Sequence, residues 1–254
     1  MQPERAVLVE ACVDSVTSSR HAVLAGAGRL EVCANLVEGG VTPSPGMLAT
    51  IRERVPVPVH VLVRPRGGDF LYNEDEMAVM LRDIAACRGA GADGVVIGAL
   101  STLGAVDREI TRRLIDAARP LAVTFHRAFD LARDAGEALE DLVALGVERV
   151  LTSGQAGTAE AGMAMLARLV SDAGERITIL AGGGIDEGNA ARIVRETGVR
   201  EIHVGGGRAV PSRMAFQRDG VAMGKPYQPD EYRRVETDPE RVRAIVREVM
   251  SHES

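Results

Sequence analysis

One local pattern recurs along this sequence of 254 residues and limits the folds that it can adopt. Four stretches read as a helix that ends at a glycine, two or three linking residues, and then a run of β-branched residues. Glycine at a helix C-terminus followed by a short loop is typical of the connection from a helix to the next strand. The four stretches cover residues 25–32, 89–96, 145–151 and 197–203.

Candidate strands and helices alternate along most of the chain. The strands are centred on Val9, Leu30, Val61, Val96, Val123, Val150, Ile179 and Ile202. The helices are predicted over residues 15–27, 43–54, 74–90, 107–118, 133–145, 159–173 and 187–197. Such alternation predicts parallel strands with crossover helices, and eight repeats favour a single (β/α)8 TIM barrel over about residues 6–208. A doubly wound open sheet is the main alternative, weakened because no G-x-G-x-x-G motif follows the first strand.

The pattern changes in a C-terminal extension over about residues 209–254. Residues 209–237 contain several prolines and glycines and predict a long, mostly irregular segment. An extra helix is predicted to begin with Asp238 as its cap and Pro239 in its first turn. Its apolar stripe places it outside the barrel or at a subunit contact. We therefore expect residues 1–254 to form one domain.

Composition and charge exclude several classes of partner. A net charge of −6 gives no basic stripe of the kind that nucleic acid requires. No apolar run approaches the roughly 20 residues needed to cross a bilayer, and the N-terminus has no signal-peptide pattern. Three cysteines without a secretion signal are expected to be reduced thiols. We expect a cytoplasmic protein that binds neither nucleic acid nor membrane.

Each predicted strand has one apolar face and one face with reactive groups. In residues 121–126, Val123 and Phe125 share one parity, whereas Thr124 and His126 share the other. Because side chains alternate between the faces of a strand, the apolar set is predicted to face the helices and the other set the barrel interior. In other strands the interior set contains Glu10 and Cys12, Glu31, Cys33 and Asn35, His60 and Arg64, and His203.

These interior groups support two interpretations. A satisfied internal ion-pair network would account for them, because an ionised group is costly to bury unless it is paired. A functional pocket at the C-terminal mouth, where barrel enzymes place their chemistry, is the interpretation we favour. In such a pocket a general acid or base could be drawn from Glu10, Glu31, His60 and His126.

Glu10-Ala11-Cys12 and Glu31-Val32-Cys33 repeat an E-x-C motif on neighbouring predicted strands. Adjacent strands lie about 4.8 Å apart, so the two thiols can approach each other, subject to the stagger of the barrel. Two thiolates suit a soft ion such as Cu(I), and imidazole can supplement them. The alternative is that both cysteines are small hydrophobic core residues.

Arginines and glycines near the ends of other strands suggest an anion site. Arg64 and Arg66 precede two glycines and form a candidate clamp, although they could instead pair with acidic residues. Glycine triplets follow the seventh and eighth strands, where TIM-barrel enzymes often hold a phosphate group; tight turns alone would also require glycine. The predicted anion-binding set is Asn35, Arg64, Arg66, Thr124, Arg127, Ser153, Gly182, Gly183, Gly184, His203, Gly205 and Gly206.

Several long motifs resemble the copper homeostasis protein CutC family. They are residues 30–33 (LEVC), 38–44 (EGGVTPS), 58–60 (PVH), 64–70 (RPRGGDF), 124–130 (TFHRAFD) and 151–154 (LTSG). The resemblance spans about Val9 to Ile202. It implies a cytoplasmic TIM barrel, usually a homo-oligomer, connected with copper tolerance, with Cu(I) held by Cys12 and Cys33. Cysteines that many members carry at the positions of Leu71 and Ala132 are absent.

Two hypotheses follow from the residues and the resemblance. The first is copper homeostasis, with Cu(I) bound by Cys12 and Cys33. The second is an enzyme or sensor for a small anionic ligand, phosphorylated or sugar-like, bound at the C-terminal mouth. In that case Arg64, Arg66 and the glycine loops would hold the anion.

Overall fold

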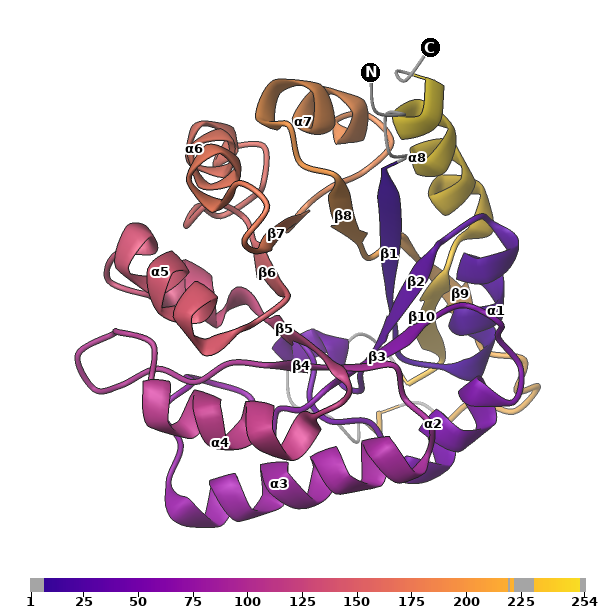
Figure 1. The fold of residues 1–254 in the computed structure, drawn as a ribbon. Helices are drawn as coiled ribbons and strands as arrows, with labels where there is room; N and C mark the ends of the chain where they lie inside the picture. The colour runs from indigo at the N-terminus through magenta and orange to yellow at the C-terminus, as the bar shows by residue number, and fades with distance from the viewer. Residues whose placement is uncertain (1–6, 219, 222–230, 252–254) are drawn as a thin grey trace.

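The computed structural model describes residues 7–218, 220–221 and 231–251. Eight parallel strands close into a barrel, with the first strand paired to both the second and the eighth (Figure 1). This closure confirms the predicted TIM barrel, and the open-sheet alternative is wrong. The barrel strands are β1 (Leu8–Val13), β2 (Arg29–Val32), β3 (Val59–Leu62), β4 (Gly94–Ile97), β5 (Ala122–Phe125), β6 (Arg149–Thr152), β7 (Thr178–Gly182) and β8 (Glu201–Val204).

Helices surround the barrel, as predicted. They are α1 (Val16–Leu24), α2 (Pro45–Arg52), α3 (Glu74–Gly89), α4 (Arg108–Ala118), α5 (Ala135–Leu145), α6 (Met163–Ala173), α7 (Ala190–Thr197) and α8 (Pro239–Ser251). Two short 3-10 helices follow β2 and β5, η1 (Leu36–Glu38) and η2 (Arg127–Leu131). The C-terminal helix α8 contacts both α7 and α1 and occupies the eighth place in the ring (Figure 1). Within the described residues, no helix has both the length and the apolar character needed to cross a membrane.

Local sequence explains where the helices begin and end. Asn73 and Glu76 form a capping box at the start of α3, in which each side chain accepts a hydrogen bond from the other residue's backbone N–H. Gly146 and Gly198 end α5 and α7 with φ angles of 75° and 74°. Few other residues adopt this left-handed conformation without strain. These glycines therefore have the role that the repeated pattern predicted.

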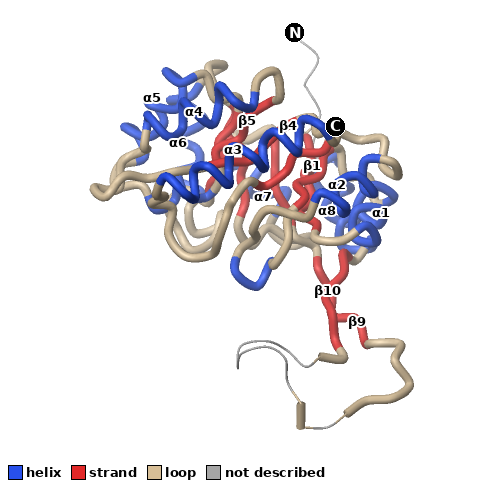
Figure 2. Tube along the Cα trace, turned by 90° about the horizontal axis from the view of Figure 1, so that it is seen from below, coloured by secondary structure: helices blue, strands red, loops and turns tan. Residues whose placement is uncertain are grey.

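The segment between β8 and α8 contains an antiparallel ribbon, β9 (Gly207–Pro211) and β10 (Arg233–Thr237). The prediction of a mostly irregular segment over residues 209–237 is wrong for these strands. Pro211 pairs with Arg233, so a long segment separates the two strands. A hairpin is recognised in a sequence by a short turn between its strands, and that signal is missing here. The ribbon projects away from the barrel at its C-terminal end (Figure 2).

The two faces of the barrel strands differ as their parity predicted. Apolar residues such as Val61 and Phe125 belong to the main core, which lies between the strands and the helices. On the interior face, Cys33, Leu62 and Val96 form a separate small cluster, with Cys12 packed against it. The parity of each strand thus separates a helix-facing core from an interior that contains the reactive groups.

Candidate functional site

A chain of buried ion pairs crosses one side of the barrel interior. Arg29 Nε donates to Glu10 Oε2, and Arg29 Nη2 lies 2.5 Å from Glu201 Oε2. Arg149 Nε lies 3.0 Å from the same Glu201 oxygen. Arg29 and Glu10 are almost completely buried, at 3% and 1% exposure. The alternative interpretation, an internal ion-pair network, therefore holds for these residues, because their charges are paired with one another.

Strand register explains which residues of this network meet. Glu10 lies opposite Arg29 on β2 and opposite His203 on β8. Neighbouring residues of a parallel pair direct their side chains to the same face, so all three enter the interior together. The sequence analysis did not assign roles to Arg29, Arg149 or Glu201. The available signal was parity, which Arg29 shares with Glu31 on β2 and Glu201 shares with His203 on β8.

His203 connects this network to the thiols. Its Nδ1 lies 2.8 Å from Glu10 Oε1, in a hydrogen bond, and 3.3 Å from Glu31 Oε2 without making one. Burial disfavours the charged imidazole, but Glu31, Cys12 and Glu10 together outweigh it and raise the pKa of His203 well above its usual range. His203 therefore lies between two carboxyl groups that favour its protonated form.

The two carboxyl groups differ in their ionisation. Burial opposes ionisation of Glu10, but the hydrogen bond with His203 and the charge of Arg29 lower its pKa to about 2. Burial raises the pKa of Glu31 to about 7, and the charge of Glu10 acts in the same direction. One carboxyl group is thus always charged near neutral pH, whereas the other exchanges a proton there.

The thiols of Cys12 and Cys33 meet at the C-terminal end of β1 and β2. Their sulfur atoms are 3.6 Å apart, and Cys33 Sγ also donates to the Val13 carbonyl at 3.6 Å. The hydrogen bond with Cys33, together with burial, raises the pKa of the Cys12 thiol well above its usual range. Ligand atoms of Cys12, Glu31 and His203 lie within 4.8 Å of one another. Thiol, imidazole and carboxyl donors are therefore brought together, in what we call the thiol site.

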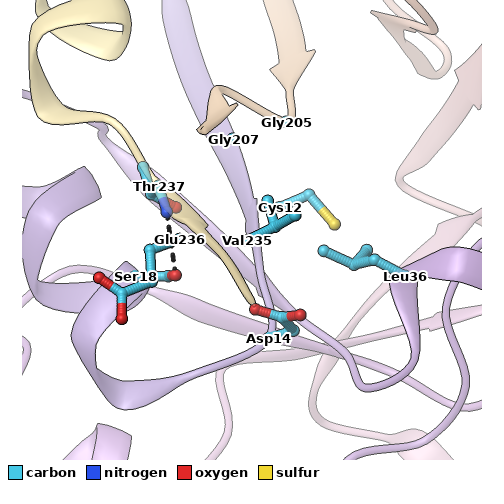
Figure 3. Close-up of a pocket in the computed structure, with 9 residues that line it drawn as sticks. All are labelled: Cys12, Asp14, Ser18, Leu36, Gly205, Gly207, Val235, Glu236 and Thr237. Atoms are coloured by element: carbon cyan, nitrogen blue, oxygen red, sulfur yellow. Dashed lines mark hydrogen bonds between the residues drawn. The ribbon is translucent and has the colours of Figure 1, made fainter. Parts of the chain in front are cut away.

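A small cavity lies beside Cys12, between the barrel and the ribbon (Figure 3). Its volume of about 20 Å³ is enough for one water molecule or one ion. Asp14 and Ser18 form one wall, and Glu236 and Thr237 of β10 form another, where the Thr237 N–H donates to Ser18 Oγ at 3.1 Å. The base of the ribbon thus encloses the outer side of the thiol site.

His60 and His126 both lie in the barrel interior, each against a glycine of β4 or of the loop after it. A β-carbon at Gly94 would lie 2.6 Å from His60 Cδ2, and one at Gly98 would lie 2.4 Å from His126 Cε1. Burial, reinforced by nearby arginines, lowers the pKa of His60 to about 4 and that of His126 to about 3. Both rings are neutral at pH 7. His60 lies beside Glu31 in the strand register, whereas His126 is not among the groups of the thiol site.

Arg64 and Arg66 hold the loops after β2 and β3. Arg64 donates to the carbonyls of Glu38, Gly40 and Gly68 at 2.8–2.9 Å, and it lies over the ring of Phe70. Arg66 pairs with Glu76 and Asp69. Most of their N–H groups are thus engaged within the chain, although the Nε of Arg64 is buried and has no hydrogen-bond partner among the described residues. Their role in anion binding stays a prediction.

The loops after β5 and β6 are joined through Asp130. Its carboxylate accepts hydrogen bonds from Arg127 Nε, Thr152 Oγ1, Gln155 N and both the N–H and the hydroxyl of Ser153, at 2.5–3.1 Å. Ser153 Oγ also accepts a hydrogen bond from Arg127 Nη2 and lies 2.6 Å from the Ala156 carbonyl, so its single proton can go either to this carbonyl or to Asp130. Ser153 is therefore saturated with hydrogen bonds and positions the loops.

The remaining predicted anion-binding residues occupy different surroundings. Asn35 is exposed and donates to Glu38, whereas the Thr124 hydroxyl is buried in the interior without a partner among the described residues. Gly182 lies beneath Leu151 and His203, and Gly183 lies against the guanidinium of Arg127. Gly184 and Gly205 are exposed, and Gly206 precedes the ribbon. The structure brings His203 into the thiol site and leaves most of the other anion-binding candidates around the mouth.

A model of the CutC family matches residues 7–208, most of the chain. The chain belongs to the CutC family. A CutC family protein of Bacteroides fragilis is 46% identical over 245 residues, covering 96% of this chain and 98% of the relative. The copper homeostasis protein cutC homolog of Homo sapiens is 45% identical, over 94% of this chain and 87% of the relative. A crystal structure of CutC from Streptococcus agalactiae superposes with a TM-score of 0.75 at 34% identity, covering 78% of this chain and 97% of that one.

Proposed function

We propose that this chain acts in copper homeostasis as a cytoplasmic protein that holds Cu(I) at the thiol site. The observation that carries the proposal is the pair of thiols 3.6 Å apart on the interior face, with a carboxyl group and an imidazole close by. Soft thiolate ligands select Cu(I) over harder ions, and imidazole also suits copper. The name of the human relative supports the same function.

In this proposal Cys12 and Cys33 bind the ion, and His203 is the third ligand. Glu10 holds His203 in place through the 2.8 Å hydrogen bond, and Arg29 in turn holds Glu10. Such outer partners fix the orientation of a metal-binding imidazole. Because thiols and imidazolium must lose protons to bind a metal, the affinity for Cu(I) should rise with pH.

Competition with a chromogenic Cu(I) chelator of known affinity tests this function. Cys12→Ser combined with Cys33→Ser should abolish competition, and His203→Asn should weaken it by about 10–100-fold. Cys87→Ser is the matched control, because Cys87 is also a buried cysteine but belongs to α3. Unchanged Cu(I) affinity in the double variant would overturn the proposal.

A second candidate function is binding of, or catalysis on, a small anionic metabolite at the mouth. It is favoured by three buried polar atoms without hydrogen-bond partners among the described residues, Arg64 Nε, Tyr72 Oη and His126 Nε2. Two of the three residues are joined through Phe70, whose ring contacts both Arg64 and His126. A thermal-shift screen with phosphorylated metabolites should then give a stabilising compound whose effect is lost in Arg64→Ala. A screen without any stabilising compound would exclude this function.

A further inference from the structure

Three buried polar side chains lie together at the C-terminal mouth, beside the end of β4. Arg64 follows β3 and His126 follows β5, and these two strands flank β4 in the barrel (Figure 1). Tyr72 lies on the loop between β3 and α3. Burial, the larger effect, raises the pKa of Tyr72 and lowers that of His126; the positive charge of Arg64 lowers both, so its guanidinium lies close to each. We call these three residues, none of them more than 6% exposed, the donor cluster.

The ring of His126 carries a hydrogen-bond donor that its own chain does not use. Its Nδ1 accepts a hydrogen bond from the Ala128 N–H at 3.1 Å, so the proton of the neutral ring is on Nε2. Nε2 is buried and has no partner among the residues that the structure describes. Gly98 makes this position of the ring possible, since a β-carbon there would lie 2.4 Å from Cε1. Because a buried N–H without an acceptor is costly, we expect an acceptor from outside the chain.

Arg64 keeps one nitrogen atom for a ligand. Its Nη1 donates to the carbonyls of Glu38 and Gly40, and its Nη2 donates to that of Gly68. Its Nε has no partner within the described part of the chain, and neither has Tyr72 Oη. The donor cluster therefore offers single hydrogen bonds from separate side chains. It does not offer the paired N–H groups with which arginine usually binds a phosphate.

The ring of Phe70 connects Arg64 with His126. Its centroid lies 5.0 Å from Cζ of Arg64 and 4.8 Å from the centroid of the His126 ring. Phe70 is partly exposed, whereas the three unpartnered atoms are closed to solvent. A ligand therefore reaches these atoms by displacing the Phe70 ring. Hydrogen bonds formed there are strong, because water is excluded.

We infer that the donor cluster binds one sp² oxygen of a small ligand, the oxygen of a carbonyl or a carboxylate group. Such an oxygen has two lone pairs, and it can accept from both Arg64 Nε and His126 Nε2. A phosphate is disfavoured, because one cation already engaged with backbone carbonyls would have to compensate a buried dianion. A neutral imidazole N–H is also a group that polarises carbonyls. The inference rests on the second candidate function, since it names the part of that ligand that enters the barrel.

NMR of the metal-free full chain, labelled with ¹⁵N at histidine, tests the inference. The probes are dihydroxyacetone, which has only a carbonyl, glycolate, which has only a carboxylate, and inorganic phosphate. The Nε2 resonance of His126, identified by its absence from His126→Phe, should shift saturably with dihydroxyacetone or with glycolate, and the responding probe identifies the group. Phosphate should cause no such shift. No saturable shift with either organic probe, or an equal shift with phosphate, would overturn the inference.

Two variants then test the role of the imidazole, with the probe's own resonances used to measure its dissociation constant. His126→Phe keeps a ring but removes the donor, and it should raise the constant at least about 10-fold, the equivalent of one hydrogen bond. His21→Phe is the matched control, because this imidazole lies on α1 outside the barrel, and it should leave the constant unchanged. Equal constants in the two variants would contradict the inference. The wild-type titration decides the question even where His126→Phe does not fold.

Failure of this inference can be distinguished from failure of the second candidate function. Phosphorylated metabolites that stabilise the chain without shifting the His126 resonance would support that function and contradict the inference. A saturable shift with an organic probe, together with a phosphorylated screen that gives no stabilising compound, would support the oxygen site and exclude a phosphorylated ligand.

Discussion

The two halves of the barrel interior differ in what they contribute. Strands β8, β1, β2 and β3 form the first half and contribute charged, imidazole and thiol side chains, whereas in the second half β4 and β7 contribute mostly small or aliphatic residues. The inward residues of the first half include Glu10, Cys12, Arg29, Glu31, Glu201 and His203. Those of the second half include Arg149 on β6, but on β4 and β7 they are Gly94, Val96, Leu180 and Gly182.

The comparison shows that the second half provides the space that the first half requires. A β-carbon at Gly94 would meet the His60 ring, and one at Gly182 would lie 3.1 Å from the β-carbon of His203. Glycine at these positions is therefore explained by the side chains packed against it, the His60 ring at Gly94 and the Leu151 and His203 side chains at Gly182, rather than by backbone turns. The reactive groups and the room for them are encoded on different strands.

Removing the central cation of the charged half should have the largest effect. Arg29→Met leaves Glu10 and Glu201 without their shared partner, and loss of one member of a buried ion pair costs about 3–5 kcal/mol of unfolding free energy. Urea denaturation followed by circular dichroism measures the loss. Arg176→Met, which breaks an exposed pair with Glu140, should lower the unfolding free energy far less, because solvent screens exposed charges. Equal losses in the two variants would show that the interior network contributes no more than a surface pair.

Filling the space in the other half should have the next largest effect. Gly94→Ala places a β-carbon 2.6–2.9 Å from the His60 ring, and overpacking of this kind costs about 1–3 kcal/mol. Gly89→Ala is the matched control, because no atom lies within 4 Å of a β-carbon there. The control should be neutral or slightly stabilising, as alanine restricts the unfolded chain. A Gly94→Ala protein as stable as the control would mean that the room at Gly94 is not required.

The neutral ring of His126 should make stability depend on pH. Its pKa is lowered from 6.5 to about 3 in the folded protein, so the unfolded chain binds more protons between these values. Stability should therefore be complete above pH 6.5 and fall as the pH is lowered toward 3, by up to about 1.4 kcal/mol per pH unit from this residue.

His126→Asn tests this dependence, because asparagine can still accept the hydrogen bond from the Ala128 N–H. The unfolding free energy of the variant should fall less steeply between pH 6.5 and pH 4.5 than that of the wild-type protein. Parallel curves would show that His126 titrates normally in the folded chain.

The smallest effect is expected at Thr124, whose buried hydroxyl has no hydrogen-bond partner among the described residues. Thr124→Val removes the polar atom while keeping the shape, and it should raise the unfolding free energy by about 0.5–1 kcal/mol. Thr197→Val should instead lower it by about 1 kcal/mol, because the Thr197 hydroxyl donates to the Ile193 carbonyl at 2.6 Å. A loss in both variants would show that the Thr124 hydroxyl has a solvent partner.

The sequence predicted the barrel well because its signals are local. Glycine ends α5 and α7, and the parity of residues such as Phe125 and Cys33 assigns the helix-facing and interior faces correctly. Periodicity within a strand specifies which side chains share a face. It does not specify which strands bring particular side chains together.

The contacts between distant residues could not be obtained in this way. Glu10 meets Arg29 and His203 because of the register between β1, β2 and β8, which no single strand encodes. The ribbon was missed for a related reason, since β9 and β10 pair across a long intervening segment. Periodicity likewise could not show that Arg64 donates to the carbonyls of the loops around it.

The position of α8 affects how the chain folds as it is synthesised. The sides of α1 and α7 that α8 covers remain exposed to solvent until the ribosome has added the segment between β8 and α8 and then the helix itself. At a translation rate of about 5–20 residues per second, these sides of α1 and α7 stay uncovered for several seconds. Nascent chains that stall between β8 and α8 are therefore expected to recruit chaperones, whereas chains that pass this segment can cover α1 and α7 with their own last helix.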